Sequence, residues 1–517
     1  MWIERLHSLT RGLLSLQNVF GGVPTASREQ PKPDQDRAAA VKEVFKESWQ
    51  GYYQHAFPHD SLRPISMSYV DNRNGWGVTA IDALSTAIVM GESETVEQIL
   101  ELVPTVDFTT TKKEKEMVSV FETNIRYIGG LLSAYDLLTG PMKDTIKDSE
   151  AVECLLQQAQ TLADSLIIAF DTPTGIPEGD IVLNPKPAQL PKGQNTIAGF
   201  GTLVLEWTHL SDLTGDGKYA NLTQHAQAYL LDPMGVLGGF PGLLGKQVST
   251  ETGEFLDSSG SWGASRDSFY EYLIKMYLYD PVAFSLYRDR WVLAADSTME
   301  YLASHPSSRQ ELTFLSDFEG NETFPRSGHL ASFAGGNFIL GGIVLGQRKY
   351  VDFGLALTDS HHETYRGTAT GIGPEGFRWI DSDHPDGDVP KDKVKFYEEN
   401  GFWPTSSSYV LRPETMESIY QAYRVTGDTK YQDLAWEAFG NIKKVCRAGV
   451  GYSSIRDVNA AMGGGFTDFE ESFWMAETLK YLYLIFGPES EVQIQADGAN
   501  TFVFNTEAHP LRVRNRS

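Results

Sequence analysis

Leu213-Thr-Gly-Asp-Gly-Lys-Tyr219 and Val425-Thr-Gly-Asp-Thr-Lys-Tyr431 are two copies of one short motif, and they decide the fold. Each copy stands between two apolar segments of helical period. The glycine readily ends the first helix, and the aspartate that follows it can cap the next one. Two copies of the same helix–turn–helix joint predict a ring built from α-hairpins.

The rest of the chain has the same 3.6-residue period, and its β-prone runs are few and short, which predicts an all-α fold. Residues 1–35 have weak periodicity and end in a polar, proline-containing stretch, so we expect a weakly ordered lead-in followed by a single domain over 36–517. Helices are predicted over about 37–56, 77–90, 118–138, 149–170, 198–212, 218–231, 267–279, 285–304, 336–361, 411–425, 430–447 and 470–486.

Composition limits the possible partners. The 517 residues are 41% hydrophobic, which is ample for a large core. Asp and Glu number 68 against 43 Lys and Arg, a net charge of −25. This charge disfavours general affinity for nucleic acid or anionic membrane and fits a neutral or cationic ligand. No run approaches the roughly 20 apolar residues of a membrane span.

The cysteines and the N-terminus say little about the compartment. Cys154 and Cys446 have no metal-binding spacing, so we expect two buried free thiols, with one long-range disulfide as the alternative. Charged residues such as Glu4, Arg5 and Arg11 interrupt the leucines of residues 1–22. That stretch therefore lacks the continuous apolar core of a secretory signal.

The C-terminal segment combines an unusual helix with a β-prone end. Phe473, Glu477 and Tyr481 share one side of the predicted helix. Most helical glutamates are solvated, but Glu477 has aromatic neighbours, so we expect it to be buried. Thr501-Phe-Val-Phe504 and Thr506-Glu-Ala-His-Pro510 follow. We expect this segment to be tied down, although chain ends usually fray.

Further carboxylates stand at helical spacing or in turns. Considered singly, each has an ordinary explanation: an intrahelical salt bridge, a helix cap, compensation of the helix dipole or an exposed turn. Considered together, most lie near helix ends, which a ring of α-hairpins would gather at one mouth. Glycoside hydrolysis needs such a set, with one carboxyl protonated and one ionised. The residues are Glu122 with Arg126, Asp267 with Glu271, Glu414 with Glu417, and Glu375.

These motifs resemble those of the class I α-1,2-mannosidases, glycoside hydrolase family 47, and especially its fungal members. The resemblance covers nearly the whole chain from Arg37 to Val513, and so many colinear motifs are more specific than any one of them. It implies an (αα)7 toroidal barrel of helical hairpins plugged by a C-terminal β-hairpin. The motifs include Trp49-Gln-Gly-Tyr52, Gly75-Trp-Gly77, Phe170-Asp-Thr-Pro-Thr-Gly-Ile-Pro177, Gly201-Thr-Leu-Val-Leu-Glu206, Ser327-Gly-His329, Gly373-Pro-Glu375, Arg412-Pro-Glu414 and Thr506-Glu507.

The resemblance also implies an activity: a Ca²⁺-dependent, inverting exo-α-1,2-mannosidase that trims terminal α-1,2-linked mannose from high-mannose N-glycans. In an inverting enzyme the two carboxyls stand about 6.5–9.5 Å apart, with room for water. Glu122 resembles the family's proton donor and Glu414 its base, with Asp267 a contested partner for the base role. Glu375 matches a further acid that is sometimes given as a donor. The positions that match sugar-contacting residues are Arg126, Glu206, Glu271, Arg412 and Phe473.

A calcium site is part of the same expectation. Ca²⁺ takes about 6–8 oxygen ligands. By resemblance, Thr506 ligates the ion directly through its hydroxyl and carbonyl, and waters and the vicinal hydroxyls of the sugar fill most remaining places. Glu417, Glu477 and Glu507 resemble the residues that hold those waters.

The chain departs from its fungal relatives at a disulfide. Ser332 and His361 stand where those relatives have two paired cysteines, so that bridge cannot form. Its loss removes roughly 2–4 kcal/mol of stabilisation. The family resemblance still implies a monomer in the secretory pathway or secreted. The loop Ser261–Arg266 helps to choose the glycan arm in the family, but its sequence does not reveal that choice.

Three alternatives remain open. A quality-control factor on the same fold would bind mannose with weak or no turnover, but such proteins usually carry further domains, and this chain stops seven residues past Pro510. A catalytically silent lectin would not need Glu122, Asp267 and Glu414. A different α/α-barrel hydrolase, such as a glucoamylase-like enzyme, would not need Thr506-Glu507.

Overall fold

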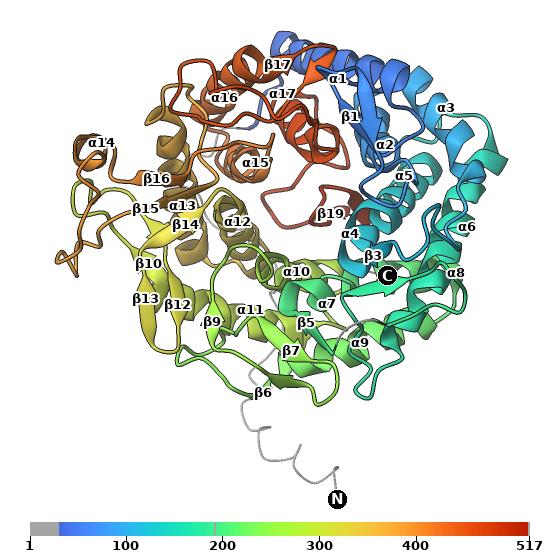
Figure 1. The fold of residues 1–517 in the computed structure, drawn as a ribbon, viewed down its shortest axis with the longest axis horizontal. Coiled ribbons are helices and arrows are strands. Elements are labelled where there is room, and N and C mark those ends of the chain that lie inside the picture. Colours follow the sequence, from blue (N-terminus) through green and yellow to red (C-terminus); the bar gives the residue numbers. More distant parts are fainter. Residues whose placement is uncertain (1–29, 191–192, 515–517) are drawn as a thin grey trace, which may run out of the picture.

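Seven helices form an inner ring in residues 30–190 and 193–514, the part of the chain that the computed structural model describes (Figure 1). Almost every residue of these helices is buried, because they pack on the barrel centre as well as on the outer ring. They are α2 (Val78–Met90), α5 (Gly129–Thr139), α8 (Val204–Thr214), α10 (Asp267–Tyr279), α12 (Phe333–Leu345), α15 (Glu414–Thr426) and α17 (Leu479–Phe486).

Seven helices of the described residues surround this ring. Each buries one face and exposes the other; in α6 the buried residues recur every three to four positions, such as Val152, Leu155 and Ala159. Residues 1–29 of the predicted lead-in lie outside the described residues. The outer helices are α1 (Gln35–His55), α3 (Ser93–Leu102), α6 (Ser149–Leu166), α9 (Lys218–Leu231), α11 (Ser285–Ser297), α13 (Arg348–Arg366) and α16 (Lys430–Cys446).

The two ends of the chain close the ring. The first helix, α1, packs against the last, α17, and the amide of Asp34 donates to the carbonyl of Phe486 (2.8 Å). In the colours of Figure 1, the blue and red ends of the described chain lie side by side. The prediction of an all-α toroid of α-hairpins is therefore confirmed.

The two repeated joints have the predicted structure. Gly215 and Gly427 end α8 and α15 with positive φ angles of 71° and 68°. The side chains of Asp216 and Asp428 accept from the amides of Lys218 and Lys430, the first residues of α9 and α16. Glycine is needed at these ends because other residues rarely adopt left-handed φ values.

Several predicted helix boundaries are wrong. The stretch predicted as one helix over 336–361 is an antiparallel pair, α12 and α13, separated at Gly346, which has a φ of 63°. The sequence pattern also missed α3 and the short α14 (Val394–Asn400). The segment predicted over 198–212 divides into α7 (Ile197–Gly201) and α8. Short apolar runs on both sides of a glycine have the same helical period, so the break was not visible.

Short non-α turns extend several helices. Three are π-helical: η2 (Thr123–Ile128), which follows α4 (Val120–Glu122), η4 (Thr298–Leu302), and η6 (Trp474–Thr478), which leads into α17. Three are 3₁₀ turns: η1 (Val103–Thr105), η3 (Ile167–Phe170) and η5 (Leu330–Ser332). η2 and η6 both lie where inner helices approach the barrel centre.

Strands in the described residues are two to four residues long and form small sheets around the ring. The pairs are β1 (Ser61–Arg63) with β2 (Ser68–Val70), β3 (Met117–Ser119) with β4 (Asp180–Val182), β10 (Ala303–Ser304) with β11 (Phe314–Leu315), and β17 (Arg447–Ala448) with β18 (Gly451–Tyr452). A four-stranded sheet has the order β5 (Gln194–Thr196), β7 (Gln247–Ser249), β8 (Glu254–Phe255) and β6 (Met234–Gly235). One three-stranded sheet has the order β13 (Glu322–Phe324), β12 (Asp317–Glu319) and β9 (Ser259–Gly260). Another has the order β14 (Arg326–Gly328), β15 (Gly376–Arg378) and β16 (Trp403–Ser406).

The predicted C-terminal hairpin lies at the centre of the ring (Figure 1). β19 (Phe502–Phe504) pairs antiparallel with β20 (Pro510–Arg512), with Val503 opposite Leu511. All three residues of β19 are buried, and the hydroxyl of Ser133 on α5 donates to the carbonyl of Pro510 (2.8 Å). The end of the chain is thus fixed inside the barrel and blocks it, as the resemblance implied.

Cys154 and Cys446 are not bonded to each other or to any described residue; Cys446 is buried and Cys154 is half-buried. At the lost-bridge positions, the Ser332 hydroxyl donates to the carbonyl of His329 (2.6 Å), and the His361 ring packs between Phe314 and Phe377. Packing and hydrogen bonds replace the covalent link. No helix of the described residues has the length and apolar content to cross a bilayer.

Candidate active site

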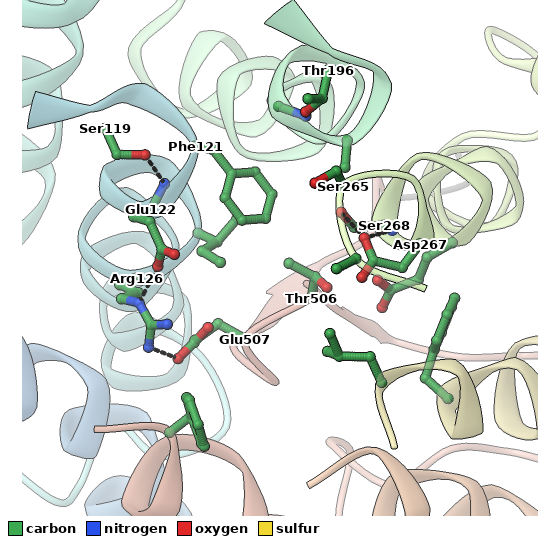
Figure 2. A pocket seen from close by; sticks show the side chains of 18 of the residues that line it. Ser119, Phe121, Glu122, Arg126, Thr196, Ser265, Asp267, Ser268, Thr506 and Glu507 are labelled. Carbon is green, nitrogen blue, oxygen red and sulfur yellow. Dashed lines mark hydrogen bonds and ion pairs between the residues drawn. The ribbon is translucent and has the colours of Figure 1, made fainter. Parts of the chain in front are cut away.

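A pocket of about 460 Å³ opens inside the ring and ends on the turn of the C-terminal hairpin. Its walls carry eight acidic side chains and two arginines. Figure 2 shows Glu122, Arg126 and Glu507 along one side, Asp267 and Ser268 on the other, and Thr506 between them. All the predicted site residues except Glu206 and Glu375 line this pocket: Glu122, Arg126, Asp267, Glu271, Arg412, Glu414, Glu417, Phe473, Glu477, Thr506 and Glu507.

Two π-helical turns supply one part of the wall. Arg126 lies in η2 and Glu477 in η6. A π-turn changes which side chains share a face, and such turns occur often at functional sites. The hydroxyl of Ser119 caps the preceding helix α4 by accepting from the amide of Glu122 (3.3 Å). This cap fixes the start of the segment that carries both Glu122 and Arg126.

The first turns of two inner helices supply the opposite part of the wall. Asp267 and Glu271 begin α10, and Glu414 and Glu417 begin α15. Because both helices start at the pocket, their unpaired amides and dipoles face the acids. The expectation that acids from distant helices meet at helix ends is confirmed.

The hairpin turn is held by its own asparagine. The Asn505 Oδ1 accepts from the amides of Glu507 (2.9 Å) and His509 (2.8 Å), and its Nδ2 donates to the carbonyl of Ile125 (2.9 Å). A Cβ on Gly129 of α5 would collide with this side chain. Glycine is therefore required there to let the hairpin approach closely enough to place Thr506 at the pocket floor.

The acids around the hairpin turn, Glu417, Glu477 and Glu507, all have raised pKa values. Burial, together with the charges of Glu271 and Glu414, raises the pKa of Glu417 to about 8, although Lys275 opposes the shift. Burial and neighbouring carboxylates also raise the pKa values of Glu477 and Glu507 well above the usual range. If all three carboxyls were ionised, their negative charge would exceed what the surrounding cations offset.

Three buried cations are packed into this region. Arg126 contacts Glu507, and Lys275 contacts Glu271. Lys480 donates to the carbonyl of Ala508 in the hairpin turn (2.6 Å) and to the Ser85 hydroxyl (2.8 Å). Burial lowers the pKa of Lys480 to about 7, so even this cation is partly neutral near physiological pH.

The proposed catalytic acids differ from one another. Burial by itself would raise the pKa of Glu414. The hydrogen bond to His329 and the charge of Arg412 outweigh burial and lower the pKa below its usual value. Burial also raises the pKa of Glu122, but the charges of Arg126 and Arg73 outweigh it, and the net pKa is lowered. Glu122 and Glu414 therefore lie ionised at neutral pH.

Asp267 behaves in the opposite way. Burial, and then the charges of Glu271 and Glu414, raise its pKa to about 7, while the amide of Ser268 opposes the shift (2.8 Å from Asp267 Oδ1). A carboxyl of this kind retains a proton near neutral pH.

Glu206 and Glu375 do not line this pocket. The Glu206 Oε1 accepts from the Tyr272 hydroxyl (2.7 Å) and from Asn505 Nδ2 (2.8 Å), so Glu206 supports the hairpin from behind. Glu375 lines the neighbouring cleft, which shares Ala264 and Leu330 with the pocket. Both of its carboxylate oxygens accept from the Nε of Arg412 (2.7 and 2.8 Å). Through Arg412, Glu375 acts on the pocket from outside.

Sequence reasoning missed several supporting residues. His329 is buried between Glu414 (2.8 Å to Nδ1) and the Tyr365 hydroxyl (2.6 Å to Nε2). It belongs to the Ser327-Gly-His329 motif, which was noticed without a role. Asp82 and His509 also lie buried behind Arg126 and the hairpin turn. All three residues lie in or beside motifs of the sequence, Ser327-Gly-His329, Thr506-Glu-Ala-His-Pro510 and Gly75-Trp-Gly77, but these motifs did not indicate a role for them.

Comparison with known proteins agrees with this architecture. The model of glycosyl hydrolase family 47 matches residues 44–513. The chain is 52% identical over 512 residues to "Probable mannosyl-oligosaccharide alpha-1,2-mannosidase 1B" of Aspergillus clavatus, covering 97% of this chain and 98% of that one. It is 48% identical to "Mannosyl-oligosaccharide alpha-1,2-mannosidase" of Penicillium citrinum, covering 96% of each.

The solved structure of "alpha-1,2-mannosidase from Trichoderma reesei" superposes on this fold with a TM-score of 0.93. It is 58% identical in sequence and covers 93% of this chain and all of that one. The (αα)7 barrel thus has a close counterpart among solved structures. By its sequence and its fold, the chain is a fungal-type member of glycosyl hydrolase family 47.

Proposed function

We propose that the protein is a Ca²⁺-dependent, inverting exo-α-1,2-mannosidase that removes terminal α-1,2-linked mannose from high-mannose N-glycans. The observation that carries the proposal is the acidic pocket whose floor is the hairpin turn with Thr506. The hairpin lies at the centre of the ring and its turn lines the pocket, which favours a site that accepts the end of a glycan chain. The names of the relatives support the linkage and the sugar.

The residues present fit a calcium ion. Thr506 offers oxygen ligands at the pocket floor, and the donors around it are carboxylates, which are the hard ligands that Ca²⁺ prefers. Within residues 30–190 and 193–514, no three His, Cys, Asp or Glu side chains are placed to hold an ion directly. This fits an ion ligated by Thr506, with Glu417, Glu477 and Glu507 acting through waters.

A bound cation would supply positive charge against the excess of buried carboxylate and a grip on the sugar's vicinal hydroxyls. The protein's own contribution is to hold the ligands. Asn505 and Lys480 fix the turn that presents Thr506. Arg126 holds Glu507 while its guanidinium lies 5.7 Å from the centre of the Phe473 ring.

Glu414 has the properties of the base. His329 and Arg412 hold it ionised, and the Tyr365 hydroxyl fixes the histidine ring from its far side. An ionised, oriented carboxylate can take a proton from the water that attacks the sugar. Asp267 retains a proton near neutral pH and is thus the weaker candidate for this role.

Glu122 is the proposed proton donor, although its lowered pKa keeps it ionised in the ligand-free protein. Glu122 must therefore take up a proton from the solvent when the substrate binds. Arg126, which also resembles a sugar-contacting residue, would share its hydrogen bonds between Glu122 and the sugar. The incoming sugar would also exclude water from Glu122. Both changes favour the protonated form of the carboxyl.

The main rival is a weakly active or inactive mannose-binding quality-control factor. An inactive factor would have no need for a base oriented as Glu414 is by His329, so the geometry favours turnover. We also propose, from the family resemblance, that the protein acts as a monomer in the secretory pathway or after secretion.

One experiment tests the proposed function. The protein is incubated with a high-mannose glycan in calcium, and the products are followed by mass spectrometry and, at early times, by proton NMR. We expect successive loss of single hexoses with β-mannose as the first product. Binding of the glycan without loss of hexose would favour the mannose-binding rival, and α-mannose as the first product would overturn inversion.

A further inference from the structure

One aromatic ring in the pocket has no partner in the protein core. Phe121 is half-buried, and within the described residues its side chain belongs to neither of the two hydrophobic clusters. Figure 2 shows its ring directed into the cavity from α4. A large apolar side chain that is kept out of the core and lines a pocket is available to contact a ligand.

The position of Phe121 along its helical segment sets its depth. Arg126, at the lower end of this segment, contacts Glu507 in the hairpin turn, and Glu122 lies one turn above it. Phe121 precedes Arg126 by five residues. The segment runs away from the hairpin turn toward its N-terminal end, so Phe121 lies more than one helical turn farther from the hairpin than Arg126. Phe121 is thus above the floor where the terminal sugar would sit.

The surroundings of Phe121 suit a second sugar ring. Ile125, one turn below on the same face, also lines the pocket outside the core clusters. Across the cavity, Figure 2 places Thr196 and Ser265, whose hydroxyls are neutral. A pyranose has an apolar C–H face and a rim of hydroxyls. An aromatic ring on one side and hydroxyls on the other match those two surfaces.

We infer that Phe121 is the platform for the leaving-group sugar, the mannose to which the terminal residue is attached. The inference rests on the proposed function and extends it from the terminal sugar to its neighbour. The Phe121 ring covers the apolar face of this sugar beside Glu122, where the glycosidic oxygen must be protonated. Phe121 therefore determines preference for a mannose-bearing substrate over an arbitrary leaving group.

A purely structural role would give a different result. If Phe121 only shielded Glu122 from water, its loss would weaken all ligands of the pocket alike or none of them. A platform for the second sugar affects only ligands that contain one. The distinction can be measured by comparing ligands of one and two sugar rings, without any turnover.

The test measures binding of two non-hydrolysable ligands in saturating calcium by titration calorimetry. One is a mannose-shaped monosaccharide iminosugar, and the other is the sulfur-linked α-1,2-mannobiose. Phe121→Ala should raise the Kd of the disaccharide about tenfold, a loss of about 1.4 kcal/mol. It should leave the Kd of the monosaccharide within about twofold, and Phe121→Tyr, which keeps the ring, should bind both ligands like the wild type.

The matched control is Phe240→Ala, which removes another partly buried phenylalanine, stacked on Tyr301 away from the pocket. It should bind both ligands like the wild type. Phe121→Leu keeps apolar bulk and serves if the alanine variant does not fold; it should lose disaccharide affinity selectively. Equal losses for both ligands, or no loss for the disaccharide, would overturn the platform. Failure of the wild type to bind either ligand would instead overturn the proposed function.

Discussion

Two groups of carboxylates face the same pocket with opposite electrostatics. Glu417, Glu477 and Glu507, around the hairpin turn, have raised pKa values. Glu122 and Glu414, on the catalytic side, have lowered pKa values although they are also largely buried. Burial alone therefore does not set the charge of an acid here.

The difference comes from the partners of each group. Glu122 is paired with Arg126 and Arg73, and Glu414 with His329 and Arg412. The acids at the hairpin turn mainly face one another, and the buried lysines and Arg126 do not offset their charge. Carboxylates crowded in this way favour either protons or a cation. The catalytic group thus has its counter-charges in the protein itself, whereas the crowded charge of the hairpin group is what the proposed calcium ion would offset.

The largest effect is expected from metal removal, which tests the hairpin group. Excess chelator should reduce hydrolysis of a high-mannose glycan at least about 100-fold, and added calcium should restore it, because the proposed ion would offset the crowded acids and bind the sugar's hydroxyls. Thermal unfolding should also shift upward with calcium concentration, since an ion that binds only the folded state stabilises it. Full turnover in excess chelator would remove calcium from the proposal.

The catalytic group is tested by removing single carboxylates. Glu122→Gln and Glu414→Gln should each lower turnover by at least about 100-fold, the usual scale for a lost general acid or base. Both variants should still bind calcium, because neither Glu122 nor Glu414 is among the residues proposed to hold the ion or its waters. The exposed Glu94 provides a control, and Glu94→Gln should retain full turnover. Turnover close to wild type in either catalytic variant would exclude that residue from its role.

A smaller effect tests the same electrostatic rule outside the pocket. Glu470 is buried and accepts from the amide of Tyr452 with one oxygen, while its other oxygen has no hydrogen-bond partner among the described residues. Burial raises its pKa to about 8 from 4.5, against the opposing pull of the Tyr452 amide and Arg447. Because the pKa of Glu470 is higher in the folded protein than in the unfolded chain, the folded state is favoured when this carboxyl is protonated. This contribution to the free energy of unfolding is fully present below about pH 4.5 and is lost as the pH rises through about 8.

Glu470→Gln should remove this pH dependence. The free energy of unfolding of the variant minus that of the wild type should therefore increase between pH 6 and pH 9, by on the order of 1–3 kcal/mol. Denaturant unfolding at several pH values in constant calcium provides the measurement. A difference that is the same at all pH values would show that Glu470 is already ionised in the folded protein.

The last prediction is that a reductant has no effect on the protein. Since Cys154 and Cys446 are unbonded, a reductant should change neither the melting temperature nor the activity. Thiol titration under denaturing, non-reducing conditions should find both cysteines reactive. Two unreactive cysteines would reveal a bond and would place the protein firmly in an oxidising compartment.

Local sequence predicted much of this molecule because the relevant signals are local. The glycines that end α8 and α15, the acids in the first turns of α10 and α15, and the apolar hairpin strands all follow from short-range spacing. The break at Gly346 was missed because α12 is apolar on every side and the buried face of α13 continues its apolar pattern at helical spacing. The supporting roles of Glu206 and Glu375 were missed because their partners lie far away in the chain.

The sequence by itself determined a ring of α-hairpins, the acids that reach its mouth and the family to which they belong. Only the tertiary structure decided which acids are ionised. The partner of Glu414 is His329, and the partner of Arg126 at the hairpin is Glu507, 381 positions further along the chain. Charge interactions depend on distance in space and on burial, and neither quantity exists until the ring has closed around the hairpin.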